Sequence, residues 1–161
     1  MDFINIRINK FFHHGPHSFL NNTFLYLHLD YIFSGLGKGN ANVSGTLFEG
    51  IQRWSENKKS LTEEMVRERA IKGIQKELSH GVQFIRSHVD ITNPDLTGLK
   101  ALLKLREKLK EIVKLQSVAV PQEGFFRYQG AERLMEQALE MGADNGNNIA
   151  FAQDSIADYW Y

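Results

Sequence analysis

Tyr26, His28 and Asp30 stand at alternate positions in the segment FLYLHLDY, residues 24–31. Alternate side chains of a β-strand point to the same side, so these three polar residues would share one surface. A histidine and a carboxylate at a strand end can bind a divalent metal ion, whereas the alternative is an ordinary strand end in which His28 binds nothing. Because a neutral phenol with a pKa of about 10 binds Zn²⁺ and Fe²⁺ poorly, Tyr26 favours the alternative. We expect no tightly bound metal.

A second group of histidines, His13, His14 and His17, lies in the segment HHGPH. Gly15 and Pro16 prevent a regular helix from aligning the three rings, and no acidic residue is near. A weak adventitious metal site is the most that this segment predicts.

Helices and strands that must position these side chains alternate through the middle of the sequence. Apolar residues recur at three-to-four spacing over residues 60–81, where Ser60 and Glu63 can form a capping box and Gly81 can end the helix. Similar patterns predict helices over residues 96–112 and 131–141, with strands over residues 82–89 and 115–120. This order is typical of a parallel α/β protein.

The two flanks of the sequence lack that pattern. Residues 1–43 form a poorly patterned segment that contains a first-strand remnant at 24–31, and residues 44–144 form a core of β/α repeats. The run Asn145-Gly-Asn-Asn148 opens an atypical tail over residues 145–161, because a buried parallel strand needs nearly continuous apolar residues. A partial sheet of this kind would expose an edge and favour self-association.

Composition excludes several classes of protein. Nineteen basic residues balance nineteen acidic ones, so we expect neither a nucleic-acid nor a membrane partner. The absence of cysteine excludes disulfides, thiolate catalysis and zinc sites built on sulfur. No apolar run approaches the roughly 20 residues that span a bilayer, and no signal-peptide pattern begins the sequence. These features predict a single cytoplasmic domain.

Three motifs in the middle of the sequence resemble one enzyme family. They are SGTLFEGIQRW (44–54), FIRSHVDITNPDLTGLKALLKLREKLK (84–110) and VAVPQEGFFRY (118–128). In the same order, they closely resemble the N-terminal half of cytosine deaminases of the amidohydrolase superfamily. The resemblance implies a partial TIM (β/α) barrel, roughly its first three β/α units. It also implies a metal-dependent hydrolase, using Fe²⁺ or Zn²⁺, in which a metal-bound water deaminates cytosine for pyrimidine salvage.

The resemblance also suggests roles for individual residues. The family's His-x-His-x-Asp motif corresponds to Tyr26, His28 and Asp30, so His28 is implied to be a vestigial metal ligand whose partner histidine is replaced. Gln122, in Val120-Pro-Gln-Glu-Gly124, corresponds to the glutamine that recognises the pyrimidine's amide edge; without that role, it is a polar loop residue. His88 is not among the family's metal ligands, so we expect His88 and Asp90 to have a supporting role.

Three functions remain open from the sequence. The first is a cytosine deaminase-like hydrolase acting on cytosine or a related amino-heterocycle. The second is a truncated, non-enzymatic half-barrel that associates with a copy of itself, because the family's later ligands and catalytic groups have no counterpart before Asp144. The third is a weak pyrimidine-binding module that retains Gln122, with a small-molecule pyrimidine as its partner. We expect this chain to be inactive alone and have no catalytic residue to name.

Overall fold

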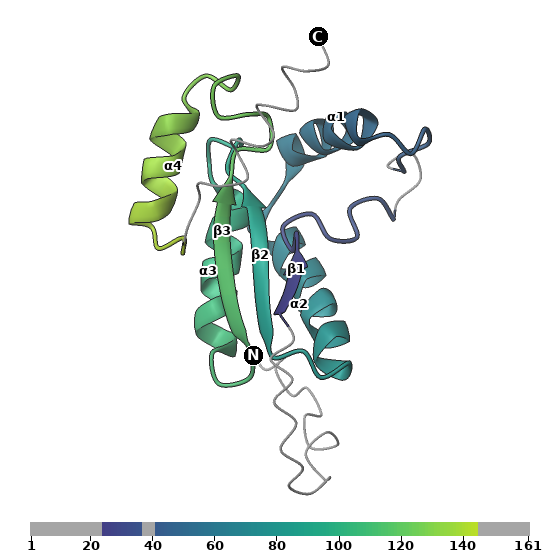
Figure 1. Ribbon diagram of the computed structural model, residues 1–161, viewed down its shortest axis with the longest axis vertical. Coiled ribbons are helices and arrows are strands. Elements are labelled where there is room, and N and C mark those ends of the chain that lie inside the picture. Colours follow the sequence, from purple (N-terminus) through teal and green to yellow (C-terminus); the bar gives the residue numbers. More distant parts are fainter. Residues whose placement is uncertain (1–23, 37–40, 145–161) are drawn as a thin grey trace, which may run out of the picture.

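Parallel strands alternate with amphipathic helices in the computed structural model, which describes residues 24–36 and 41–144 (Figure 1). The elements follow the chain in a fixed order: β1 (Phe24–Leu27), α1 (Leu47–Asn57), the 3₁₀ helix η2 (Lys58–Ser60), α2 (Glu63–Ser79), β2 (Phe84–Asp90), α3 (Thr97–Leu109), β3 (Lys114–Val120) and α4 (Ala131–Glu140). The predicted α/β class is therefore confirmed. No helix in this part of the chain is long and apolar enough to cross a bilayer.

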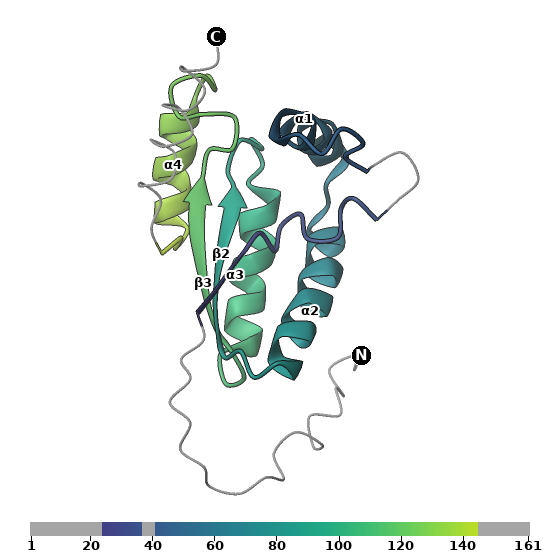
Figure 2. The same ribbon diagram turned by 45° about the vertical axis from the view of Figure 1, so that its right-hand side comes forward.

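The three strands form one parallel sheet in the order β1-β2-β3. Phe24 pairs with Phe84 at one end, and Asp90 pairs with Val120 at the other. Because all three strands run the same way, the residues that follow them meet at one edge of the sheet. Figures 1 and 2 show α1 beyond this carboxyl-terminal edge, set apart from the other helices.

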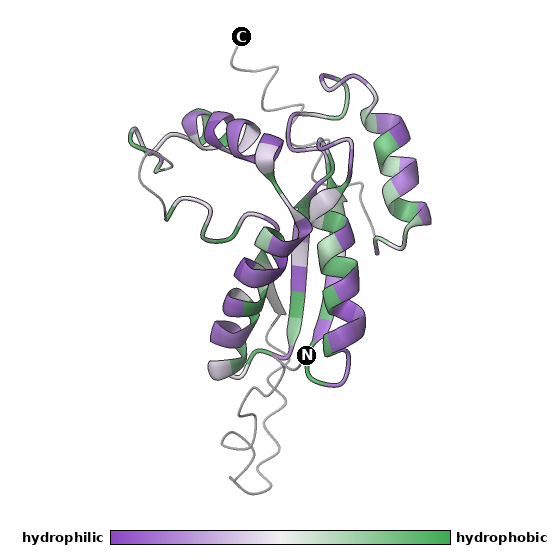
Figure 3. Cartoon of the chain, turned by 180° about the vertical axis from the view of Figure 1, so that it is seen from behind, coloured by the Kyte–Doolittle hydropathy of each residue, from purple (hydrophilic) through white to green (hydrophobic). Residues whose placement is uncertain are grey.

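Helices α2 and α3 lie side by side against one face of the sheet (Figure 2). Seen from behind in Figure 3, the outer surface of α2 is mostly hydrophilic, as expected of an amphipathic helix. Apolar side chains of both helices pack against the strands beneath them and form the core, which includes Val66, Ile74, Ile85, Val89, Leu99, Leu102, Leu105 and Leu115. Helix α4 lies beside β3 and adds Leu134 and Ala138 to this core.

The first strand is shorter than the predicted segment 24–31, because it ends at Leu27. Beyond that point, side chains replace the backbone ladder: Leu29 N donates to Ser87 Oγ at 3.0 Å, and Asp90 N donates to Asp30 Oδ2 at 2.8 Å. Residues 29–35 then form turns. The prediction that Asp30 lies in a regular strand is wrong, although Asp30 remains beside β2.

The predicted start of the helix over residues 60–81 also needs correction. Helix α2 begins at Glu63, and Thr62 is its N-cap, with Thr62 Oγ1 accepting from Met65 N at 3.2 Å. Ser60 lies in η2 instead, where its hydroxyl donates to the Asn57 carbonyl at 3.2 Å, so the predicted Ser60–Glu63 capping box is wrong. Gly81 has φ +83° just after the helix, which confirms its predicted role as a helix stop.

Helix α1 has no counterpart among the helices that the sequence predicts. Thr46 caps it by accepting from Glu49 N at 3.3 Å, and the Glu49 carboxylate in turn accepts from Val43 N at 3.0 Å and Ser44 N at 2.6 Å. Trp54 is the buried residue of this helix. The predicted histidine segment at 13–17 and the predicted tail at 145–161 lie outside the described residues, as do residues 37–40.

The N-cap of α2 gives a direct stability test. Thr62→Ala removes the side-chain acceptor of Met65 N and should lower the free energy of unfolding by about 1 kcal/mol. The matched change Ser60→Ala removes only an exposed hydrogen bond and should leave stability nearly unchanged. Urea unfolding of both variants measures the difference, and equal effects would contradict the assigned cap.

Candidate functional site

Polar residues from all three strands meet at the carboxyl-terminal edge of the sheet. His28 and Asp30 follow β1, Asp90 ends β2, and Gln122 follows β3. The sequence predicted these residues as candidates, and the parallel register brings them to one place. Tyr26 lies within β1, opposite Arg86.

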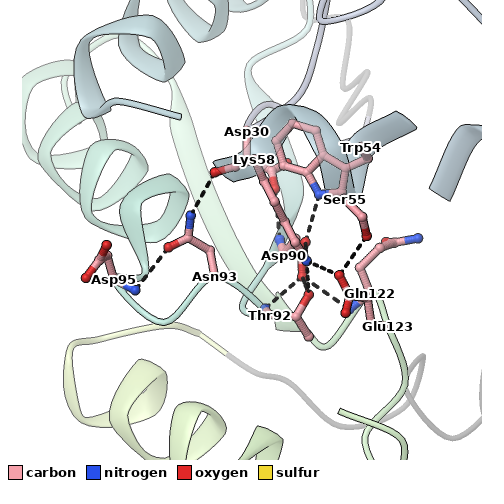
Figure 4. Close-up of polar contacts among 10 residues, drawn as sticks. All are labelled: Asp30, Trp54, Ser55, Lys58, Asp90, Thr92, Asn93, Asp95, Gln122 and Glu123. Carbon is pink, nitrogen blue, oxygen red and sulfur yellow. Dashed lines mark hydrogen bonds and ion pairs between the residues drawn. The ribbon is translucent and has the colours of Figure 1, made fainter. Parts of the chain in front are cut away.

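Asp90 is the centre of a buried hydrogen-bond network (Figure 4). Its Oδ2 accepts from Trp54 Nε1 at 2.7 Å and from Lys58 Nζ at 3.3 Å. Its Oδ1 accepts from the Thr92 backbone N at 2.8 Å, the Thr92 hydroxyl at 2.6 Å and the Gln122 backbone N at 3.3 Å. These donors satisfy a carboxylate that would otherwise be costly to bury.

Lys58 joins this network to the loop after β3. Its buried ammonium donates to Thr92 Oγ1 at 2.7 Å and forms an ion pair with Glu123. Ser55 Oγ also donates to Glu123 Oε1, at 2.7 Å. The Tyr128 ring lies 5.8 Å from Lys58 Nζ, within the range of a cation–π contact. Segments at residues 55–58, 90–92 and 122–123 are thereby held together.

Sequence reasoning missed Trp54, Lys58 and Glu123 as members of this site. Trp54 and Glu123 lie inside motifs that carry the family resemblance, so those motifs were the available signal. Lys58 lies outside those motifs. It is followed by Lys59, and two adjacent lysines are typical of a solvent-exposed surface.

His28 lies in a row of rings beside the Asp90 network. Its ring is stacked on Tyr31 at 4.5 Å between centroids and lies 5.4 Å from the His88 ring, while Tyr31 lies 4.7 Å from Trp54. Burial, helped by the nearby His88, lowers the pKa of His28 to about 4. His28 is therefore neutral at neutral pH, and its buried Nδ1 has no hydrogen-bond partner among the described residues.

Asp30 is buried and poorly compensated compared with Asp90. Its Oδ2 accepts from Asp90 N, whereas its buried Oδ1 has no partner in the described part of the chain. Burial raises the pKa of Asp30 to about 7, and the Asp90 charge adds to the shift. A side chain at Gly98 would crowd this carboxyl group, because its Cβ would lie 3.1 Å from the Asp30 Cβ.

These residues do not fit a tightly bound divalent ion. Across residues 24–36 and 41–144, no three His, Asp or Glu side chains are grouped where they could hold a metal. Both Asp90 oxygens already accept hydrogen bonds, and Asp30 has a raised pKa that disfavours the anionic ligand. The implied role of His28 as a vestigial ligand thus remains a prediction from the resemblance.

A cavity of about 290 Å³ opens beside the network. Tyr31, Trp54 and Gln122 line it, together with polar groups of Asn42, Arg53 and Asn57. Gln122 is partly buried, and its backbone N donates to Asp90 Oδ1 at 3.3 Å, which connects the loop after β3 to the end of β2. Aromatic walls with a few polar groups are the usual features of a site for a small planar molecule.

Comparison with known proteins finds amidohydrolases that are similar to this chain. No model of a known protein family matches the chain. A curated relative, N-isopropylammelide isopropyl amidohydrolase from Pseudomonas sp. (strain ADP), is 33% identical over 87 residues, which are 53% of this chain and 22% of the relative. The predicted resemblance to the amidohydrolase superfamily is confirmed.

Solved structures of two enzymes are also similar to this chain. A 5-methylcytosine deaminase from Klebsiella pneumoniae, solved with 5-fluorocytosine, is 46% identical with a TM-score of 0.72, over 75% of this chain and 29% of its own. N-isopropylammelide isopropylaminohydrolase from Burkholderia multivorans is 28% identical with a TM-score of 0.61, over 75% of this chain and 30% of its own. The chain therefore spans less than a third of the length of these relatives.

The pKa values of His28 and Asp30 predict opposite effects of pH on stability. Below pH 6.5 the unfolded chain protonates His28 but the folded chain does not until about pH 4, so stability falls as pH drops. Above pH 3.8 the unfolded chain releases the Asp30 proton but the folded chain keeps it until about pH 7, so stability falls as pH rises. The two contributions oppose each other between pH 4 and 6.5.

Single variants should separate these contributions. In Asp30→Asn, the unfolding free energy should rise with pH between 4 and 6.5, relative to the unmodified chain, by at most about 1.4 kcal/mol per pH unit. In His28→Asn, it should fall with pH by a similar amount. Urea unfolding across this range tests both, and identical pH slopes in all three proteins would contradict the assignment.

Proposed function

We propose that this chain is the substrate-recognition part of a cytosine deaminase-like amidohydrolase and binds cytosine or a related planar amino-heterocycle. The observation that carries the proposal is the position of Gln122 on the wall of an aromatic-lined cavity at the carboxyl-terminal edge of a parallel sheet. Catalytic and binding groups of β/α barrels lie at this edge. The 46% identity to a 5-methylcytosine deaminase supports the choice of ligand.

The residues that line the cavity would make different contacts with a bound heterocycle. The Gln122 amide offers both a donor and an acceptor, which match the paired acceptor and donor of a pyrimidine's amide edge. The Tyr31 and Trp54 rings provide apolar surface beside it. Such a lining suits a planar ring with an amide edge better than an aliphatic substrate.

The same proposal treats the sheet as roughly the first three β/α units of a TIM barrel. The parallel order β1-β2-β3 and the helices α2 and α3 on one face agree with such a unit. In the family that the chain resembles, a bound metal ion supplies an activated water for deamination. Because the described residues do not fit that ion, we propose that the chain alone binds the heterocycle without releasing ammonia.

A second proposed function is self-association through the sheet. The outer edge of β1 has no partner strand in the described segments. The edge of β3 is partly protected, because Ser117 N donates to Asp144 Oδ2 at 2.8 Å and Asp144 N donates to the Ser117 carbonyl at 2.8 Å. An unprotected parallel edge favours pairing with another chain, and a second copy supplies the same edge.

Calorimetric titration with cytosine tests the recognition proposal. We expect weak binding, with a Kd on the order of 1 mM, and a loss of about tenfold in Gln122→Ala when one amide contact is removed. Gln116→Ala is the matched control, because Gln116 lies within β3 and accepts from Arg86 Nε at 3.0 Å, outside the cavity. Absence of heat at millimolar cytosine, or equal losses in the two variants, would contradict the proposal.

Sedimentation velocity tests self-association. The sedimentation coefficient should rise with protein concentration, and Asp144→Ala should increase the rise because it removes the side chain that protects the β3 edge. A single species of 18.5 kDa at every concentration, in both proteins, would refute pairing through these edges.

A further inference from the structure

The loop that carries Gln122 is attached to the rest of the site at two neighbouring points. Gln122 N donates to Asp90 Oδ1 at 3.3 Å, which is a long hydrogen bond and a weak restraint by itself. Glu123 makes the second attachment, through its ion pair with Lys58 and the hydroxyl of Ser55. The cavity position of Gln122 therefore depends strongly on what holds Glu123 (Figure 4).

Lys58 is suited to that task because its ammonium is shared between two strand ends. On the β2 side, it donates to Asp90 Oδ2 at 3.3 Å and to Thr92 Oγ1 at 2.7 Å, and on the β3 side it pairs with Glu123. An ammonium has three protons, so these three acceptors can use all of them. The side chain is only 9% exposed, and solvent screens the pairs less than at the surface.

Removing this cation would leave two carboxylates, Asp90 and Glu123, without the charge that lies between them. Trp54, Thr92 and Gln122 still donate to Asp90, whereas among the described residues Glu123 would retain the Ser55 hydroxyl as its donor. Glu123 is also the more exposed of the two, at 30%. The loop after β3 is therefore the part that would move, since Asp90 is fixed inside the sheet.

We propose that Lys58 is a positioning residue that holds Gln122 at the cavity wall through Asp90 and Glu123, and so sets the affinity for the amide edge of a heterocycle. This inference rests on the proposed recognition function. Lys58 acts on the ligand through the loop and is not one of the residues that line the cavity.

Hydrogen exchange in the ligand-free full chain tests the positioning step by itself. Lys58→Met should speed exchange of the Gln122 backbone amide by about tenfold, the loss expected for one charge-assisted hydrogen bond, while backbone amides of β2 and α3 stay protected. Lys59→Met is the matched control, because Lys59 belongs to the same 3₁₀ turn but is exposed. Unchanged exchange of the Gln122 amide in Lys58→Met would overturn the proposal.

Cytosine titration then tests the link to recognition. Lys58→Met should weaken binding by about fivefold to tenfold, and the double variant with Gln122→Ala should bind no more weakly than Gln122→Ala alone. Additive losses would show that Lys58 acts independently of Gln122 and would overturn the proposal. If the unmodified chain binds no cytosine but exchange at Gln122 responds to Lys58→Met, the recognition function fails while the positioning step stands.

A second variant covers the case in which Lys58→Met does not fold. Glu123→Gln weakens the same attachment from the more exposed side and leaves the buried Lys58–Asp90 pair intact. It should also speed exchange of the Gln122 amide and weaken cytosine binding. We expect each effect to be about threefold, because a neutral acceptor remains at position 123. No change in either measurement would contradict the role given to the Lys58–Glu123 pair.

Discussion

The buried Asp90 carboxylate is the interaction on which the arrangement of this site depends. Its two oxygens accept from Trp54, Lys58, Thr92 and Gln122, which come from α1, η2 and the loops after β2 and β3. A buried carboxylate is tolerated only when donors surround it, so the segments that provide them are held in place together. Asp90 thus holds α1 above the sheet and, together with the Lys58–Glu123 pair, contributes to the position of Gln122 at the cavity.

The contrast between Asp90 and Asp30 explains why the described residues at this edge of the sheet do not fit a tightly bound metal ion. Asp90 has donors for both oxygens, whereas Asp30 has one and a pKa raised to about 7 by burial. His28, next to them, is kept neutral by burial. Near neutral pH, His28 is thus uncharged and Asp30 is only partly ionised, and Tyr26 occupies the third position of the motif.

Local patterns were sufficient to predict most of the elements. Leu99, Leu102 and Leu105 recur at helical spacing and are buried in α3. Gln122 lies two residues after the end of β3, a strand that the sequence predicts. The residues that follow parallel strands lie at one edge of the sheet, so the sequence alone predicts that Asp90 and Gln122 lie near each other. The barrel to which such a sheet would belong stays a proposal.

The missed features depend on contacts between residues that are distant in the sequence. Helix α1 is anchored by Trp54 donating to Asp90, 36 residues away, and Lys58 pairs with Glu123, 65 residues away. Neither partner is visible in a local window, and Lys58 looks like its exposed neighbour Lys59. The early end of β1 has the same cause, because the Ser87 hydroxyl and the Asp30 carboxyl replace backbone partners across the sheet.

Metal loading and turnover can be measured together on this chain. The full chain is loaded with Zn²⁺ or Fe²⁺, freed of unbound ion, and assayed for bound metal and for ammonia release from cytosine. We expect much less than one ion per chain and no ammonia above the protein-free rate. One tightly held ion per chain with sustained ammonia release would contradict this expectation.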